Sequence, residues 1–246
     1  SLDENGAVNV TNPYASAGTV ITSRLPYTGD IDGDNKEETI STSTDAQGLT
    51  VLNVESSGST AEAATGIKEV SSIRLFDLDG DGVREIYIDG KDANADTITC
   101  VAFYSPDESQ PLHLALFDSQ SYAQGSIKEF ADSKLILDTE MNILGTYKVK
   151  NVYALADKSF SKASDDIVFD NNMTYVTTSK SITLSNGSLL ATGTKLRFTS
   201  TDGSSVINFV TDGGFTGSIP IASSGSGWTI SGQPDTSYFT SLPYKN

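Results

Sequence analysis

The sequence predicts an all-β protein, and three observations support this prediction. Val, Ile, Thr, Tyr and Phe recur in short runs such as TVLNV and EIYI, a composition typical of strands. Asp-Gly and Asn-Gly dipeptides separate several of these runs and favour tight turns. Long stretches of good helix formers are scarce. With 246 residues, 37% of them hydrophobic, the chain can build one large domain or two smaller ones.

The charge of the chain excludes some classes of partner. Asp and Glu outnumber Lys and Arg by 32 to 16, which gives a formal net charge of -16. Such a surface repels phosphate backbones and anionic lipid headgroups, whereas it attracts cations. We therefore expect no nucleic-acid partner. No apolar run approaches the length of a transmembrane segment, so none is expected in this sequence.

Two residues with potential chemistry occur only once each. Cys100 is the sole cysteine, which excludes an intrachain disulfide and cysteine-rich zinc sites. Its surroundings, TITCVAFY, alternate as a strand does, and this predicts a buried, inert thiol. His113 is the sole histidine, and PLHLALF places Leu112, Leu114 and Leu116 on one strand face and His113 on the other. We expect a solvated strand histidine rather than a catalytic base.

The chain divides into a leader and two domains. Residues 1–18 form a polar leader, which indicates that a signal peptide or lipid anchor once preceded it. An N-terminal β domain is expected over residues 19–165. A polar stretch at 161–172 marks the boundary, and a second domain is expected over 172–246.

Strands are expected along both domains. In the first domain SIKEFADS, at 126–133, is expected to make a helical turn or two. The predicted strands of that domain cover 19–27, 39–44, 49–56, 72–78, 86–90, 100–105, 112–119, 133–139 and 147–155. Those of the second cover 174–178, 181–184, 194–201, 204–211 and 218–222. Asp202-Gly203 and Asp212-Gly213 are dipeptides that two-residue hairpin loops accept, so we expect such loops there.

One acidic motif occurs twice, and the copies lie 47 residues apart, since 77 − 30 = 47. Each copy has aspartates at positions 1, 3 and 5 and a glutamate at position 9, and each leads into β-branched residues. A period near 50 residues indicates a small β unit that is used repeatedly. The aspartates are Asp30, Asp32 and Asp34 in the first copy and Asp77, Asp79 and Asp81 in the second; the glutamates are Glu38 and Glu85.

This spacing is suited to calcium. Calcium takes about six to eight oxygen ligands in tolerant geometry, and side chains at positions 1, 3 and 5 can turn toward one centre. The peptide carbonyl at position 7, Lys36 or Val83, is expected to add a ligand, with the glutamate at position 9. The turn requires a residue that accepts positive φ at position 6, where the copies have Asn35 and Gly82.

The loops are not EF-hands. An EF-hand needs a bidentate glutamate at position 12 and a helix on each side, but position 12 is Ser41 or Ile88 here and strands follow. Over residues 20–100 the chain resembles the FG-GAP or VCBS-type repeats of β-propeller blades. The resemblance implies an extracellular, calcium-stabilised scaffold. About 150 residues are too few for a full propeller, so we expect a propeller-like sheet or a sandwich with two DxDxDGxxE-type calcium loops.

The second domain has a resemblance of its own. Residues 181–221 resemble the SH3-like β-barrels that follow such repeats in secreted or lipid-anchored proteins of Gram-positive gut bacteria. The closing SYFTSLPY is similar to the tail of those proteins. Aromatic side chains crowd the last residues, and Trp228 and Tyr244 are candidate ligand contacts. Alternatively, the tail folds back and its aromatic side chains fill the barrel core.

The sequence favours a non-catalytic function. It contains no G-x-S-x-G elbow, P-loop, G-x-G-x-x-G or H-E-x-x-H motif. We therefore expect a calcium-binding adhesion or scaffold protein, extracellular or anchored to the cell surface, with a glycan or protein partner. The alternative is a carbohydrate-active or other hydrolase, because two of the 32 acidic residues could meet in space.

Overall fold

The all-β prediction is confirmed in the computed structural model, which describes residues 18–164, 167–170, 174–225 and 227–245. Within these ranges the helical elements are two short 3-10 turns, η2 (Thr22–Arg24) and η3 (Asp235–Ser237). No helix in the described ranges has the length and apolar character needed to cross a membrane. Most of the predicted leader lies outside the described residues.

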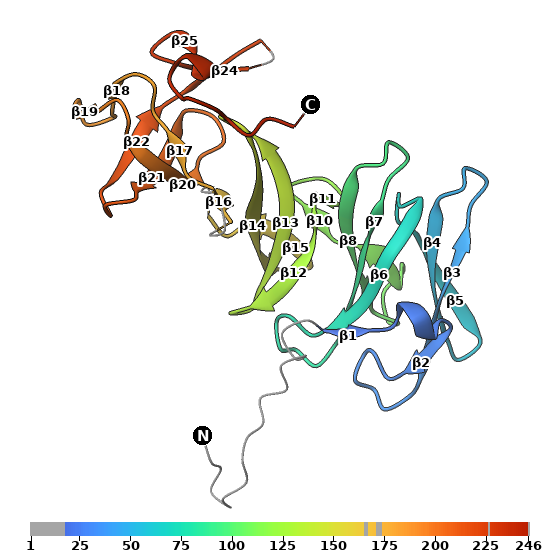
Figure 1. Ribbon diagram of the computed structural model, residues 1–246. Coiled ribbons are helices and arrows are strands. Elements are labelled where there is room, and N and C mark those ends of the chain that lie inside the picture. Colours follow the sequence, from blue (N-terminus) through green and yellow to red (C-terminus); the bar gives the residue numbers. More distant parts are fainter. Residues whose placement is uncertain (1–17, 165–166, 171–173, 226, 246) are drawn as a thin grey trace, which may run out of the picture. The chain divides into compact units, whose positions relative to one another are not determined.

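The described chain forms two compact units (Figure 1). Unit 1 contains the described residues up to Leu137 together with Tyr153–Ser161, and unit 2 contains Asp138–Val152 and the described part of Lys162–Asn246. The predicted boundary at 161–172 lies where the chain enters unit 2 for the second time. The sequence pattern did not indicate that Asp138–Val152 also belong to unit 2.

Two four-stranded antiparallel meanders occupy the first part of unit 1. Their strand orders are β2-β3-β4-β5 and β6-β7-β8-β9, and every neighbouring pair is antiparallel. The edge strands β1 (Thr19–Val20) and β11 (Ala123–Gln124) add to the second meander. The meander strands are β2 (Tyr27–Gly29), β3 (Glu38–Thr44), β4 (Thr50–Ser56), β5 (Ser59–Ala64), β6 (Glu69–Phe76), β7 (Glu85–Lys91), β8 (Thr97–Tyr104) and β9 (Leu112–Leu114).

The remaining strands of unit 1 include a correction to the sequence prediction. Residues 126–131 form strand β12 and no helical turn. Ile127 and Phe130 are both buried at helix-like spacing, but Phe130 stacks on Phe76 with ring centroids 4.3 Å apart, and this packing overrides the local pattern. The strands here are β10 (Leu116–Phe117), β12 (Ser126–Ala131), the start of β13 (Lys134–Asn142), the end of β14 (Thr146–Ala156) and β15 (Ser159–Lys162).

The expected face of Leu116 is also wrong. Leu112 is fully buried, but Leu116 is 48% exposed. The strand is interrupted after Leu114, and β10 begins at Leu116 and pairs with β15 instead. Ala115 takes the buried position, so the alternation restarts with the opposite phase.

Apolar side chains form two cores in unit 1. One lies among β3, β4, β6, β7 and β8 and contains Ile40, Leu52, Ile73 and Cys100. Cys100 is fully buried, as predicted, and burial raises the pKa of its thiol to about 12. The second core is centred on aromatic side chains. It includes Tyr87, Phe117, Phe130, Tyr153 and Phe160.

Unit 2 is built on an antiparallel arrangement of short strands. β14 pairs with β16, β16 with β20, β20 with β21 and β21 with β22. The strands that lie wholly in unit 2 are β16 (Ile167–Phe169), β17 (Val176–Thr177), β18 (Ile182–Thr183), β19 (Leu189–Leu190), β20 (Lys195–Thr201), β21 (Val206–Thr211), β22 (Thr216–Pro220), β23 (Ala222–Ser224), β24 (Gly227–Ile230) and β25 (Gln233–Pro234).

The hairpins of unit 2 occur where they were predicted, but their loops are longer. Four residues separate β20 from β21 and β21 from β22, rather than two. In the first loop, Oδ1 of Asp202 accepts the backbone N–H groups of Ser204, Ser205 and Val206. These bonds favour a wider, side-chain-stabilised turn over a two-residue turn.

Candidate metal centre

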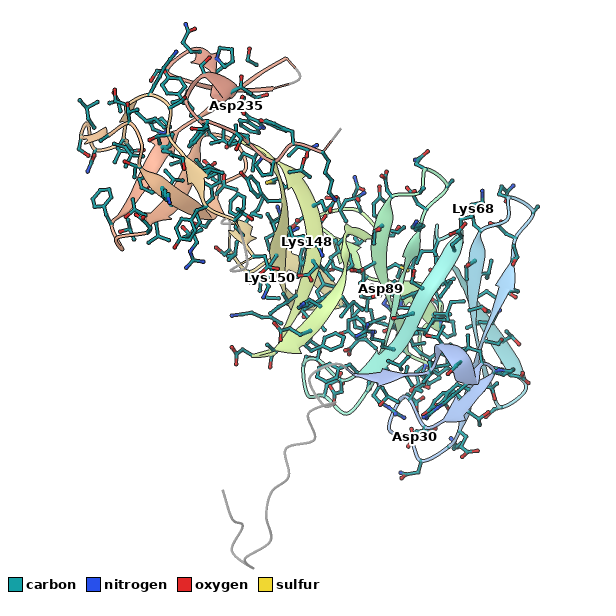
Figure 2. All side chains as sticks on the ribbon, in the orientation of Figure 1. Asp30, Lys68, Asp89, Lys148, Lys150 and Asp235 are labelled. Atoms are coloured by element: carbon teal, nitrogen blue, oxygen red, sulfur yellow. The ribbon has the colours of Figure 1, made fainter. Side chains whose placement is uncertain are left out.

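The two acidic motifs occupy equivalent places in the fold. Residues 30–37 connect β2 to β3, and residues 77–84 connect β6 to β7, so each motif joins the first and second strands of its meander. We call them loop 1 (residues 30–38) and loop 2 (residues 77–85). Figure 2 shows Asp30 in loop 1, beyond the β2–β3 end of unit 1.

The backbones of the loops turn inward on their first aspartate. Oδ1 of Asp30 accepts the N–H of Gly33 at 2.7 Å, and its Oδ2 accepts the N–H of Asn35 at 3.0 Å. In loop 2, Asp77 accepts from Gly80 at 2.7 Å and from Gly82 at 3.0 Å in the same way. The predicted positive φ at position 6 is confirmed: it is 65° at Asn35 and 92° at Gly82. Each loop therefore folds back on itself as a compact acidic turn.

The glutamate at position 9 closes each loop from inside the protein. Oε2 of Glu38 accepts the N–H of Ile31 at 2.9 Å, and Oε2 of Glu85 accepts the N–H of Leu78 at 3.0 Å. Both glutamates begin the second strand of a meander and are almost completely buried, with 0% and 1% of their surfaces exposed. Each loop thus combines half-buried or exposed aspartates with a buried glutamate.

Burial raises the pKa of both glutamates. Desolvation raises the pKa of Glu38, and it raises the pKa of Glu85 to about 7. A raised pKa means that the folded protein holds the proton more tightly than the unfolded chain does. Without a cation, the contribution of Glu85 to stability is therefore largest below its unfolded pKa of 4.5 and is lost as the pH rises toward 7. A nearby cation opposes this loss because it favours the charged carboxylate.

The carboxylates converge in each loop, although not to the same extent. In loop 2, oxygens of Asp77, Asp79, Asp81 and Glu85 all lie within 4.8 Å of one another. In loop 1 the corresponding group contains Asp30, Asp32 and Glu38. This is the arrangement expected of oxygen ligands around one hard cation.

The remaining aspartate of the loop 1 motif, Asp34, pairs with a lysine. Its Oδ2 accepts the ammonium of Lys36 at 2.7 Å, and hydrogen bonds from Lys36 lower the pKa of Asp34. Position 7 of loop 2 is Val83, which has no charge to offer Asp81. The backbone N–H groups of Lys36 and Val83 bond to Asp34 and Asp81. The predicted role of their carbonyls as ligands stays a prediction.

The two loops contact each other, a feature that the sequence pattern did not reveal. The backbone N–H of Arg84 donates to the carbonyl of Ile31 at 2.8 Å, and its guanidinium donates to the carbonyl of Asp30. A Cβ placed on Gly33 would lie 3.2 Å from the carbonyl oxygen of Gly82. Arg84 is the one basic residue within loop 2. A single cation among acidic residues is the feature of the sequence that could have indicated this contact.

Asp89 is a second buried carboxylate that sequence reasoning missed. It lies on β7, is 4% exposed, and is labelled within unit 1 in Figure 2. It accepts the hydroxyl of Thr99 at 2.6 Å and the backbone N–H of Ile127 at 3.1 Å, so it joins β7 to β8 and β12. An aspartate within the apolar run EIYID was the signal. Its hydrogen-bond partners are a threonine hydroxyl and a backbone N–H, and no second carboxylate accompanies it among the described contacts.

His113 packs against an aromatic ring and lies near a carboxylate. Its ring stacks on that of Phe103 with centroids 5.7 Å apart, and Nδ1 lies 3.9 Å from a carboxylate oxygen of Glu108. The side chain is half-buried on β9. The described contacts include no serine or cysteine that His113 would activate.

The aromatic residues of the C-terminal tail pack and form hydrogen bonds within unit 2. Trp228 is half-buried against the unit 2 core, and its Nε1–H donates to the carbonyl of Asn142 at 2.8 Å. Tyr244 is 39% exposed, and its hydroxyl donates to the buried Asp235. The N–H of Thr146 donates to the carbonyl of Pro243 at 3.0 Å, so the tail packs against β14. This is the packing expected of a folded-back tail, and a ligand contact at Trp228 and Tyr244 stays a prediction.

Comparison of the chain with protein-family models, with curated proteins and with solved structures gave no significant match.

Proposed function

We propose that the chain is an extracellular, non-catalytic binding or scaffold module whose two loops each hold one calcium ion. One observation carries this proposal: two loops 47 residues apart in sequence (77 − 30) repeat the same inward hydrogen bonds and the same buried glutamate. Acidic turns that arose independently would share neither the position-9 glutamate nor its bond to the position-2 N–H. A common ion-binding geometry accounts for both.

Calcium suits these loops better than other common metal ions do. The converging ligands are carboxylate oxygens, and zinc prefers nitrogen and sulfur ligands, which the loops lack. Magnesium demands near-ideal octahedral geometry and keeps its waters. The aspartates are half-buried or exposed, so a cation can reach them from solvent.

The ions would hold the scaffold together. Each loop joins the first two strands of a meander, and Arg84 links the loops through the backbone of residues 30 and 31. Neutralising the carboxylates would remove repulsion at this point. Four-stranded meanders with an acidic loop after the first strand also support the resemblance to FG-GAP or VCBS-type repeats. By the same resemblance we propose that unit 2 is the SH3-like barrel, and that the protein is secreted or anchored at the cell surface.

A hydrolase is the weaker candidate. Glu85, whose raised pKa is typical of a general acid, is 1% exposed and lines neither of the hollows that border the loops. A substrate could not reach it without opening the fold. The accessible carboxylates of the loops are the ones that a cation would occupy.

A calcium titration by isothermal calorimetry tests the proposal. We expect two ions per chain, with tighter binding at loop 2, because Lys36 engages Asp34 in loop 1 whereas Asp81 joins the group in loop 2. Asp79→Asn should remove the tighter site and Asp32→Asn the weaker one, since each amide keeps the size of the side chain but not its charge. Asp96→Asn, on the distant β7–β8 turn, is the matched control and should leave both sites intact. Unchanged binding in both loop variants, or equal affinity for magnesium, would contradict the proposal.

A further inference from the structure

A cleft of about 860 Å³ opens beside loop 1 in unit 1. Four connections line it: loop 1, Val83 of loop 2, the end of the β4–β5 hairpin, and the loop between β8 and β9. In an antiparallel meander, the first and third connections lie at the same end, so these segments meet although they are far apart in sequence. The volume lies in the range of small-ligand sites and far exceeds the space that one metal ion needs.

Acidic residues line the cleft from two of these connections. Asp32 and Asp34 lie on the loop 1 wall, and Asp107 and Glu108 lie on the β8–β9 wall. Among the described residues that line the cleft, Lys36 is the only basic one. The end of the β4–β5 hairpin also contributes hydroxyl groups to the lining. These belong to Ser56, Ser57, Ser59 and Thr60.

The chemistry of the cleft selects a cationic ligand. Within it, the ammonium of Lys36 already lies 2.7 Å from Oδ2 of Asp34, which shows that this wall accepts an ammonium group. The β8–β9 wall is similar, because the ammonium of Lys158 donates to Glu108 from outside the lining. Asp107 is exposed on the same wall and faces solvent.

A sugar ligand fits less well. Sugar sites present an aromatic face on which the ring stacks, and the one aromatic residue of the lining, Tyr104, is only 5% exposed. An anionic ligand would meet Asp107 and Glu108 even when calcium occupies loop 1. An extended peptide is favoured because the cleft is open and has hydroxyl groups that can bond to a peptide backbone.

We propose that the cleft binds a lysine- or arginine-bearing peptide segment of a partner protein. This inference names the partner of the binding module and rests on that proposed function. Its determinants on the β8–β9 loop lie outside the calcium ligands, so the two can fail separately.

The test is a fluorescence-anisotropy titration of a labelled Gly-Lys-Gly-Lys-Gly-Lys peptide, in calcium and at physiological salt. The double variant Asp107→Asn/Glu108→Gln should weaken binding about tenfold, the effect of losing two exposed charge pairs. The double variant Asp92→Asn/Asp96→Asn removes two charges at the opposite end of the meander and should weaken it less than about twofold. The corresponding glutamate peptide should not bind.

Three outcomes would overturn the proposal. The native chain could fail to bind the peptide, or both double variants could weaken binding equally. The third outcome is that the native chain binds maltohexaose instead of the peptide, and that Asp107→Asn/Glu108→Gln abolishes this maltohexaose binding. Equal weakening would mean attraction by net charge alone. The calcium titration is run on the same variants. If the ions bind normally while the cleft variant binds peptide as the control does, the cleft inference fails alone. If no ion binds but the cleft variant still selectively loses peptide, the calcium proposal fails alone.

Discussion

Glu85→Ala is expected to lower the free energy of unfolding by about 3 kcal/mol even when calcium has been removed with a chelator. The reason is that the buried carboxylate accepts two hydrogen bonds, from the N–H of Leu78 at 3.0 Å and from the hydroxyl of Tyr87 at 3.0 Å. Alanine leaves both donors without an acceptor in a site that is 1% exposed. Urea unfolding at pH 5, well below the raised pKa of Glu85, measures the change.

Two further variants isolate the cause. Glu85→Gln keeps an acceptor for Leu78, so we expect a much smaller loss of stability in chelator, together with the loss of the tighter calcium site. Glu62→Ala, at an exposed position on β5, should change stability by less than about 0.5 kcal/mol. Equal stability of the Glu85→Ala and Glu62→Ala proteins in chelator would show that the glutamate does not close loop 2 from inside.

Asp89→Ala is expected to cost about 2 kcal/mol of unfolding free energy. The substitution orphans the N–H of Ile127, whereas Thr99 retains the carbonyl of Gly125 as a second acceptor at 2.9 Å. Because Asp89 joins β12 to β7, hydrogen exchange of the β12 amides should accelerate more than that of the β3 amides. If hydrogen exchange accelerated equally across unit 1, Asp89 would not act locally to hold β12 against β7.

The stability conferred by Asp89 also depends on pH. Burial raises the pKa of Asp89 above its usual value of 3.8. The folded state therefore holds the proton more tightly, so this contribution is complete below the unfolded pKa and falls as the pH rises through the folded pKa. Asp89→Asn, which does not titrate, should flatten that part of the stability curve relative to the native chain.

The sequence indicated the local features of the site well, because they depend on residues close together in the chain. The spacing of the acidic residues, the need for positive φ at Asn35 and Gly82, and the burial of Cys100 could all be deduced from short segments. Most predicted strands are present for the same reason. The all-β class required no knowledge of long-range packing.

The features that were missed depend on contacts between distant segments. The Arg84 bonds connect residues 54 and 53 positions apart, which no local pattern reports. Residues 126–131 became a strand because Phe76 and Asp89, both far away in sequence, bind Phe130 and Ile127. The cleft arises from four connections that meet only in the folded meanders. Tertiary packing decided each of these cases.

Thermal unfolding of the native chain in calcium and in chelator tests the central claim, that calcium ions in the two loops hold unit 1 together. With free calcium at about 100 times the dissociation constant, each ion should stabilise the fold by roughly 2.7 kcal/mol. For a chain of this size that corresponds to a midpoint at least about 5 °C higher in calcium than in chelator. The Asp32→Asn/Asp79→Asn double variant should lose this difference. Identical midpoints for the native chain in calcium and in chelator would contradict the account.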